Sequence, residues 1–147
     1  MIRRLLLITS ILGYSSFAWA QKKIHHSEMA PAPIGPYSQA VEANGLVFVA
    51  GQIGIHPNTK KLVTGGVEAE VPQIMENILA ILKAAHLDYT NIVNTTIYVK
   101  DLSDFQRINT LYGKYFQSNY PARTTVGVSD LPAGANVEIT VIAARMK

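Results

Sequence analysis

The hydrophobic residues of the chain recur with two different periods, and these periods predict two kinds of secondary structure. A spacing of three to four residues, typical of an amphipathic helix, occurs in residues 67–85 and again from residue 103 until Pro121 ends the pattern. Alternating or continuous apolar runs, typical of strands, occupy residues 37–42, 46–52, 92–99, 123–128 and 136–144. Asn44 and Gly45, between the first two strands, indicate a tight hairpin.

The order of these elements, β-β-α-β-α-β-β, predicts an α+β fold with a single mixed sheet and both helices packed on one face. The strand at residues 46–50 is apolar at consecutive positions, and the strand at residues 137–144 also carries apolar residues on both faces, so both faces of each strand need cover. Two helices can cover only one face of a sheet of this size. We therefore expect a second copy of the chain on the other face, which makes the protein a homo-oligomer.

Local signals refine the ends of these elements. Residues 21–36 contain three prolines and are expected to form an irregular segment, with neither a helix nor a central strand. Ser103 and Gln106 have the spacing of a capping box, which predicts that they begin the second helix. The buried side of that helix is expected to carry Phe105, Ile108, Tyr112, Tyr115 and Phe116.

The first residues of the chain have the pattern of a secretory signal peptide. Arg3 and Arg4 precede an apolar run from residue 5 to residue 12, and Ala18-Trp19-Ala20 resembles a cleavage site. We expect residues 1–20 to be a signal peptide and residues 21–147 to form the mature domain, which would be periplasmic or secreted. The alternative is that this segment is retained as a membrane anchor.

Charge and cysteine content narrow the function further. The chain has 13 basic and 10 acidic residues, and two of the basic residues lie in the expected signal peptide, so the mature domain is close to neutral. Without a cluster of Lys or Arg, a nucleic-acid surface is not expected. The chain has no cysteine, which excludes thiol catalysis and thiolate metal sites. The four histidines do not form a spaced ligand pair, so no metal site is expected.

Two charged residues stand out because they interrupt strand patterns: Arg123 begins one strand and Glu138 lies within the next. Charges inside a sheet are rarely left unpaired. One interpretation is a structural salt bridge at the rim of the sheet. The other is an arginine that binds a ligand carboxylate, beside a glutamate that orients water. If the last two strands pair antiparallel with Arg123 opposite Thr140, Glu138 lies diagonally about 7–8 Å away.

Four short motifs are spread along the chain, at residues 32–40 (APIGPYSQA), 49–53 (VAGQI), 121–123 (PAR) and 137–139 (VEI). Together they resemble the RidA/YjgF family of reactive imine and enamine deaminases, and the similarity extends over residues 24–146. The resemblance implies a chorismate-mutase-like fold and a homotrimer with ligand clefts between subunits. It also implies hydrolysis of 2-imino acids to 2-keto acids and ammonia, without a metal or cofactor.

The same resemblance assigns roles to individual residues. By position, Arg123 corresponds to the carboxylate-binding arginine and Glu138 to the acidic residue near the attacking water. Tyr37, Gly51 and Asn109 correspond to residues that line the cleft. The chain has an alanine at residue 50, where many members have Ser or Thr. Two alternatives to imine hydrolysis remain open: a periplasmic module that binds small carboxylates without turnover, and a chaperone-like stress protein.

Overall fold

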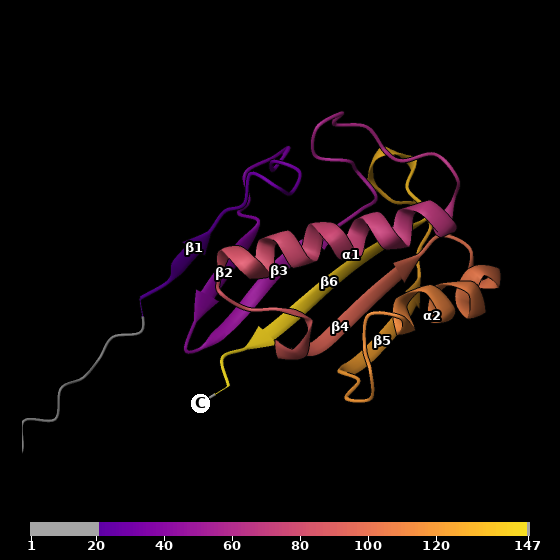
Figure 1. Ribbon diagram of the computed structural model, residues 1–147. Helices are drawn as coiled ribbons and strands as arrows, with labels where there is room; N and C mark the ends of the chain where they lie inside the picture. The colour runs from indigo at the N-terminus through magenta and orange to yellow at the C-terminus, as the bar shows by residue number, and fades with distance from the viewer. Residues whose placement is uncertain (1–20, 147) are drawn as a thin grey trace, which may run out of the picture.

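The computed structural model describes residues 21–146, which form one sheet of six strands with two helices packed on one face (Figure 1). The predicted α+β architecture is therefore confirmed. The elements in chain order are β1 (Lys23–His25), β2 (Ala40–Ala43), β3 (Leu46–Gln52), α1 (Val67–Ala84), β4 (Ile92–Val99), α2 (Phe105–Gly113), β5 (Ala122–Gly127) and β6 (Val137–Ala144). The predicted signal peptide, residues 1–20, lies outside the described residues.

The strands lie in the order β1-β2-β3-β6-β4-β5 across the sheet. In the described sheet β4 and β5 are parallel and all other neighbours are antiparallel, which makes it mixed, as predicted. Parallel neighbours need a crossover, and α2 supplies it between β4 and β5. β6 then returns on the other side of β4. The last two strands are therefore not neighbours, so the condition for a diagonal contact, Arg123 opposite Thr140, is not met.

The N-terminal part of the sheet is built from a hairpin and a short edge strand. Asn44 and Gly45 both have positive φ angles, 51° and 77°, as a two-residue hairpin turn requires, so the predicted hairpin is confirmed. Residues 21–36 are not wholly irregular, because β1 pairs antiparallel with β2. An edge strand of three residues is too short to show an alternating pattern, which explains why the sequence did not predict it.

The second helical region begins differently from the prediction. The Asp101 carboxylate accepts a hydrogen bond of 2.8 Å from the Ser103 backbone N–H, and a 3₁₀ turn over Leu102–Asp104 leads into α2. The prediction that Ser103 and Gln106 form a capping box is therefore wrong. Asp101, two residues before Ser103, satisfies one free backbone donor at the start of the 3₁₀ turn, and α2 itself begins without a side-chain cap.

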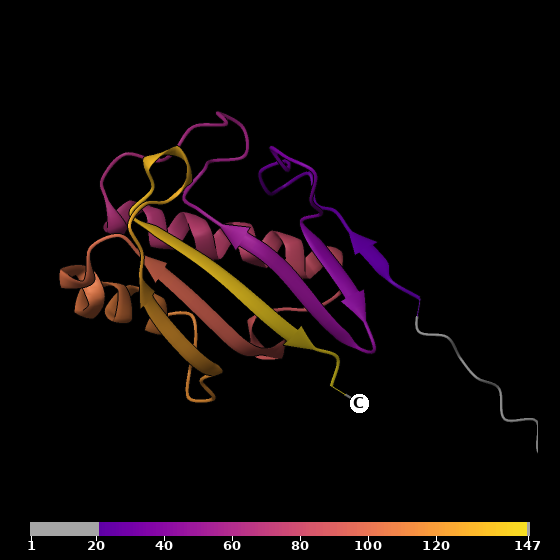
Figure 2. The ribbon, with the colours of Figure 1, turned by 180° about the vertical axis from the view of Figure 1, so that it is seen from behind.

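The hydrophobic core lies between the sheet and the two helices. α1 buries one face of apolar side chains against β3 and β6, where Val47, Val49, Ile139 and Val141 point toward the helix. The opposite face of the sheet carries no helix (Figure 2). Phe48 on that face is 44% exposed and Val126 is 39% exposed. This uncovered apolar surface agrees with the expectation of a partner chain, which itself stays a prediction. Among residues 21–146, no helix has both the length and the apolar composition of a membrane span.

Candidate active site

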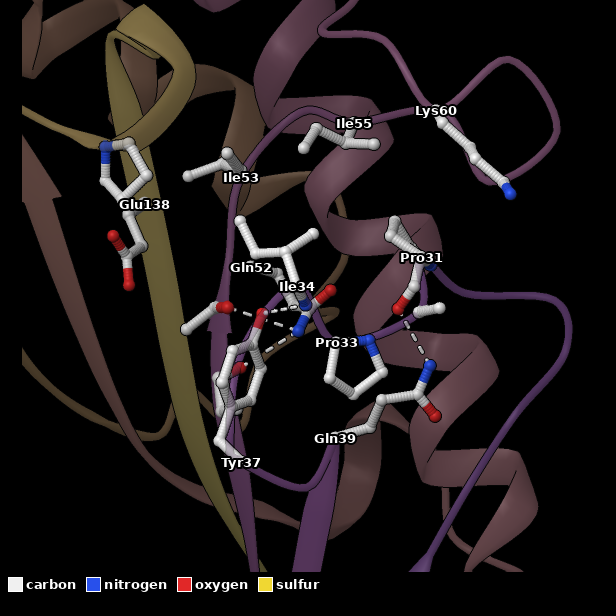
Figure 3. Close-up of a pocket in the computed structure, with 14 residues that line it drawn as sticks. Pro31, Pro33, Ile34, Tyr37, Gln39, Gln52, Ile53, Ile55, Lys60 and Glu138 are labelled. Carbon is white, nitrogen blue, oxygen red and sulfur yellow. Dashed lines mark hydrogen bonds between the residues drawn. The ribbon is translucent and has the colours of Figure 1, made fainter.

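A pocket of about 570 Å³ opens where β3 ends and β6 begins (Figure 3). Most of its lining is apolar, with prolines and isoleucines from residues 31–34 and 53–55. Its polar groups are few: Tyr37, Gln39, Gln52, Lys60 and Glu138. In Figure 3, Lys60 extends away from Glu138, so the glutamate faces mainly apolar groups. A largely apolar cavity with a few polar side chains is typical of a site for a small molecule.

Glu138 is the one carboxylate among the described residues that line this pocket. Its side chain is half-buried, and no hydrogen bond or ion pair to it occurs within residues 21–146. Burial without a compensating partner raises the pKa of Glu138 above the ordinary value of 4.5. A carboxylate in this state is a stronger base than an exposed one, and its oxygens are free to accept protons from water or from a ligand.

Gly51 makes room for the Glu138 carboxylate. A Cβ atom at residue 51 would lie 1.8 Å from Glu138 Oε1, so no larger residue fits unless the carboxylate moves. The close approach occurs at an irregularity in the pairing of β3 with β6, between Val49 and Gln52. Irregularities of this kind often redirect side chains near functional sites. The structure thus brings Gly51 and Glu138, two of the predicted site residues, into contact.

The wall of the pocket opposite Glu138 is held by Gln39, a residue outside the predicted site (Figure 3). Its buried side-chain amide donates to the carbonyl oxygens of Ser27 (3.1 Å) and Pro31 (2.9 Å), and its Oε1 atom accepts from the Ser27 N–H (2.7 Å). The Tyr37 hydroxyl accepts a 3.3 Å hydrogen bond from the Ile34 N–H, so its ring lies in the pocket. A glutamine beside a run of prolines is a signal that could have indicated this anchoring role.

The beginning of β6 is fixed from the helix layer by Glu70. This buried glutamate in the first turn of α1 accepts hydrogen bonds from the backbone N–H groups of Asn136 (2.8 Å) and Val137 (3.3 Å), and also from the Asn136 side chain. Gly54 packs directly on Glu70, where a Cβ atom would come within 2.9 Å. The residue that precedes Glu138 is therefore held in place by α1.

Arg123 and Asn109 lie together in another part of the molecule. The Arg123 Nη2 atom donates a 2.7 Å hydrogen bond to Asn109 Oδ1, and the guanidinium lies 5.2 Å from the centre of the Tyr112 ring. Arg123 is exposed at the beginning of β5. The remaining N–H groups of its guanidinium are available for a planar anion such as a carboxylate.

Within one chain Arg123 and Glu138 do not meet. Arg123 is level with Thr95, which faces the helices, whereas Glu138 alternates with the buried Val137 and Ile139 and so faces the other side of the sheet. The predictions of a structural salt bridge and of a diagonal contact between Arg123 and Glu138 within one chain are therefore both wrong. The predicted residues instead form two half-sites, which we define as the acidic half-site (Tyr37, Gly51 and Glu138) and the basic half-site (Asn109 and Arg123).

The fold and the pocket define a small α+β protein with a cavity suited to a small molecule. The model of the Endoribonuclease L-PSP family matches residues 27–145. The chain belongs to this family, the RidA/YjgF family that its motifs resemble.

Similar proteins are found in distant organisms. The 2-iminobutanoate/2-iminopropanoate deaminase of Homo sapiens is 43% identical over 122 residues, which cover 83% of this chain and 89% of the human protein. A crystal structure of the Rid family protein YyfA from Yersinia pestis has a TM-score of 0.83 at 42% identity, covering 85% of this chain and all of that one. The structure of TdcF from E. coli with bound serine has a TM-score of 0.80 at 38% identity, covering 84% and 99%.

Proposed function

We propose that the protein is a homotrimeric hydrolase that converts reactive 2-imino acids to 2-keto acids and ammonia. The observation that carries the proposal is the division of the site: the acidic and basic half-sites lie on opposite faces of one sheet. A neighbouring chain packed on the uncovered face could bring its own basic half-site to the acidic one. The name of the human relative and the serine bound to the E. coli relative support a small amino-acid-like substrate.

In this proposal Arg123 binds the substrate carboxylate. A guanidinium grips a planar carboxylate with two parallel hydrogen bonds, whereas the ammonium of a lysine acts as a point charge. Asn109 occupies one side of the guanidinium and so limits the directions from which the carboxylate can approach. The imine carbon, next to the carboxylate, is then directed toward the apolar pocket that contains Glu138.

Glu138 acts on water as a general base. The Glu138 carboxylate takes a proton from a water molecule. At the same time the oxygen of this water bonds to the electrophilic carbon of the protonated imine, which gives a tetrahedral amino alcohol. The proton passes to the amine nitrogen, the C–N bond breaks, and loss of the hydroxyl proton gives the keto acid and ammonia. A positioned base of this kind accelerates a reaction by about 10² to 10⁴. The raised pKa of Glu138 improves its strength as a base.

The test is to generate 2-iminopropanoate from alanine with an amino-acid oxidase and to follow its hydrolysis with the purified protein. We expect the wild-type protein to accelerate hydrolysis. Arg123→Ala should lower kcat/KM by about 100-fold or more, because a charge-assisted bidentate contact is lost. Its melting temperature should be unchanged, since Arg123 is exposed. Turnover close to that of wild type in this variant would remove the proposed role.

A second candidate function is binding of small carboxylates without turnover. The serine bound to the E. coli relative favours it, since a ligand can occupy such a site without being consumed. This function would be supported, and the first contradicted, if pyruvate raises the melting temperature while hydrolysis of 2-iminopropanoate stays at the uncatalysed rate.

The pattern of residues 1–20 leads us to propose a periplasmic or secreted protein, so its substrate would be an imino acid formed outside the cytoplasm.

A further inference from the structure

We infer that Tyr112 is a positioning residue for Arg123, and that its ring holds the guanidinium in the orientation that receives a ligand carboxylate. This inference rests on the proposed role of Arg123. It concerns a residue on α2 that is buried and that does not line the pocket around Glu138. It therefore assigns a function to part of the core.

Arg123 needs a second contact to keep one orientation. It projects from β5, the last strand in the sheet order, and its side chain is exposed. Within the described residues its one hydrogen bond goes to Asn109 Oδ1. A single hydrogen bond leaves the guanidinium free to turn about that contact. The Tyr112 ring removes this freedom, because its centre lies 5.2 Å from the guanidinium carbon, within the range of a cation–π contact.

The ring itself is rigid. Tyr112 is 2% exposed, its hydroxyl is 2.9 Å from the hydroxyl of buried Thr95, and its ring centre is 4.8 Å from that of Phe116. Thr95 is also the register partner of Arg123 on β4. The ring therefore packs at the level of the sheet from which the arginine projects.

Asn109 and Tyr112 act on Arg123 from one face of α2. They are three residues apart, so they lie on neighbouring turns of the same side of the helix. Asn109 Oδ1 fixes one nitrogen of the guanidinium, and the Tyr112 ring contacts the group as a whole. A guanidinium held in this way is preorganised, and a carboxylate binds without paying the full entropy of ordering a long side chain.

The consequence is specific to ligand binding. Loss of the ring should weaken the affinity for the keto acid pyruvate by about tenfold, within the range measured for cation–π contacts. KM for 2-iminopropanoate should rise by a similar factor, while kcat changes by less than about threefold, because Tyr112 does not line the pocket in which Glu138 acts on water. A change that merely loosened the core would not separate KM from kcat in this way.

The experiment compares three variants with wild type: Tyr112→Leu, which removes the ring; Tyr112→Phe, which keeps it; and Phe116→Leu, a matched core control. Phe116 contacts Tyr112 but has no contact with Arg123 of its own among the aromatic and cation–π contacts of the described residues. The measurements are pyruvate affinity by calorimetry, KM and kcat for 2-iminopropanoate, and melting temperature. We expect the tenfold loss of affinity in Tyr112→Leu only, with Tyr112→Phe and Phe116→Leu within about threefold of wild type.

Equal pyruvate affinity in Tyr112→Leu and Phe116→Leu would overturn the inference, as would a tenfold loss in Tyr112→Phe. If Tyr112→Leu does not fold, fluorinated phenylalanines at residue 112 weaken the ring's attraction for cations without changing its shape. Affinity should then fall with each added fluorine, and constant affinity would overturn the inference. A wild-type protein that neither binds pyruvate nor hydrolyses the imine contradicts the proposed function itself. Pyruvate binding that needs Arg123 but not the ring contradicts only the role of Tyr112.

Discussion

Gly51 and Glu138 show how strongly one missing side chain can determine the chemistry of a site. The Glu138 carboxylate occupies the position that a Cβ atom of residue 51 would take. The carboxylate thus packs directly against the backbone of β3, and this burial raises the pKa of Glu138. A mutation at residue 51 therefore tests the glutamate without altering it.

We expect Gly51→Ala to lower kcat for imine hydrolysis by roughly tenfold or more, since displacing a catalytic group by about 1 Å can cost 10²-fold. The methyl group must push the carboxylate aside, which should also cost about 1–3 kcal/mol of unfolding free energy. Steady-state kinetics and urea denaturation measure the two effects. Gly113→Ala is the matched control, because a Cβ atom there meets nothing within 4 Å. A Gly51→Ala enzyme with wild-type kcat would show that the position of the carboxylate does not matter.

The raised pKa of Glu138 predicts the pH dependence of activity. A general base works only when ionised, so kcat/KM should fall as the pH is lowered through a pKa above the ordinary carboxyl value of 4.5. A pH profile of hydrolysis, with the oxidase kept in excess at every pH, measures this fall in kcat/KM at acidic pH. Glu138→Gln should have low activity, and its kcat/KM should not fall in this pH range. If the fall persists unchanged in Glu138→Gln, the titration belongs to another group.

For single residues, the sequence predicted which residues form the candidate site better than it predicted which of them lie in contact. Arg123 and Glu138 stood out because charges interrupt strand patterns, and the motifs added Tyr37, Gly51 and Asn109; their roles stay predictions. The structure groups Asn109 with Arg123, and Tyr37 and Gly51 with Glu138. Tyr112 was correctly predicted on the buried side of the second helix. Its contact with Arg123 depends on which strand lies beside β4, and no local pattern contains that information.

At the scale of elements, the edge strand β1 is held by a charged cluster. Glu42 on β2 accepts hydrogen bonds from Arg145, after β6, and lies 2.7 Å from the buried His25 of β1. Arg145 also donates to the Ala85 carbonyl at the end of α1. The hydrogen bonds from Arg145, and then from His25, lower the pKa of Glu42 to about 2. Four segments that are distant in the sequence thus depend on one carboxylate.

We expect Glu42→Gln to lower the free energy of unfolding at pH 7 by about 1.5–3 kcal/mol, the usual size for hydrogen bonds to a charged group. Because the folded pKa lies below the ordinary value of 4.5, the contribution of the carboxylate is present above pH 4.5 and is lost as the pH falls toward 2. The stability gap between variant and wild type should therefore close over that range in urea titrations. Glu28→Gln, at an exposed carboxylate, is the control. A gap that stays constant down to pH 2 would contradict this account.

The elements themselves were largely predictable, and their arrangement was not. Periodicity predicted both helices and five strands, because each has an alternating or helical pattern long enough to detect. The position of β6 between β3 and β4 was missed, because the preference of consecutive strands for pairing is only a tendency. The loop of residues 128–136 is long enough to carry the chain across β4, and this crossing places Arg123 and Glu138 on separate strands with β4 between them.

For the whole molecule, the two half-sites make complementation the decisive test of the proposed trimer. Arg123→Ala chains keep the acidic half-site, and Glu138→Gln chains keep the basic one. Each variant alone should be inactive. Refolded together in equal amounts, they should recover about a quarter of wild-type activity, because each site draws its halves independently from two chains. Light scattering should show three chains per particle in every sample. Mixtures as inactive as the separate variants would place both halves of the site in one chain and contradict the proposal.

The uncovered face of the sheet has a further consequence for the activity of the protein at low concentration. Under the proposed assembly, a lone chain carries both halves of a site but can close neither, so dissociation abolishes catalysis while every chain is still folded. Specific activity should therefore drop on serial dilution below the dissociation constant and return on concentration. The abundance of the protein in its compartment would then act as a threshold for imine removal.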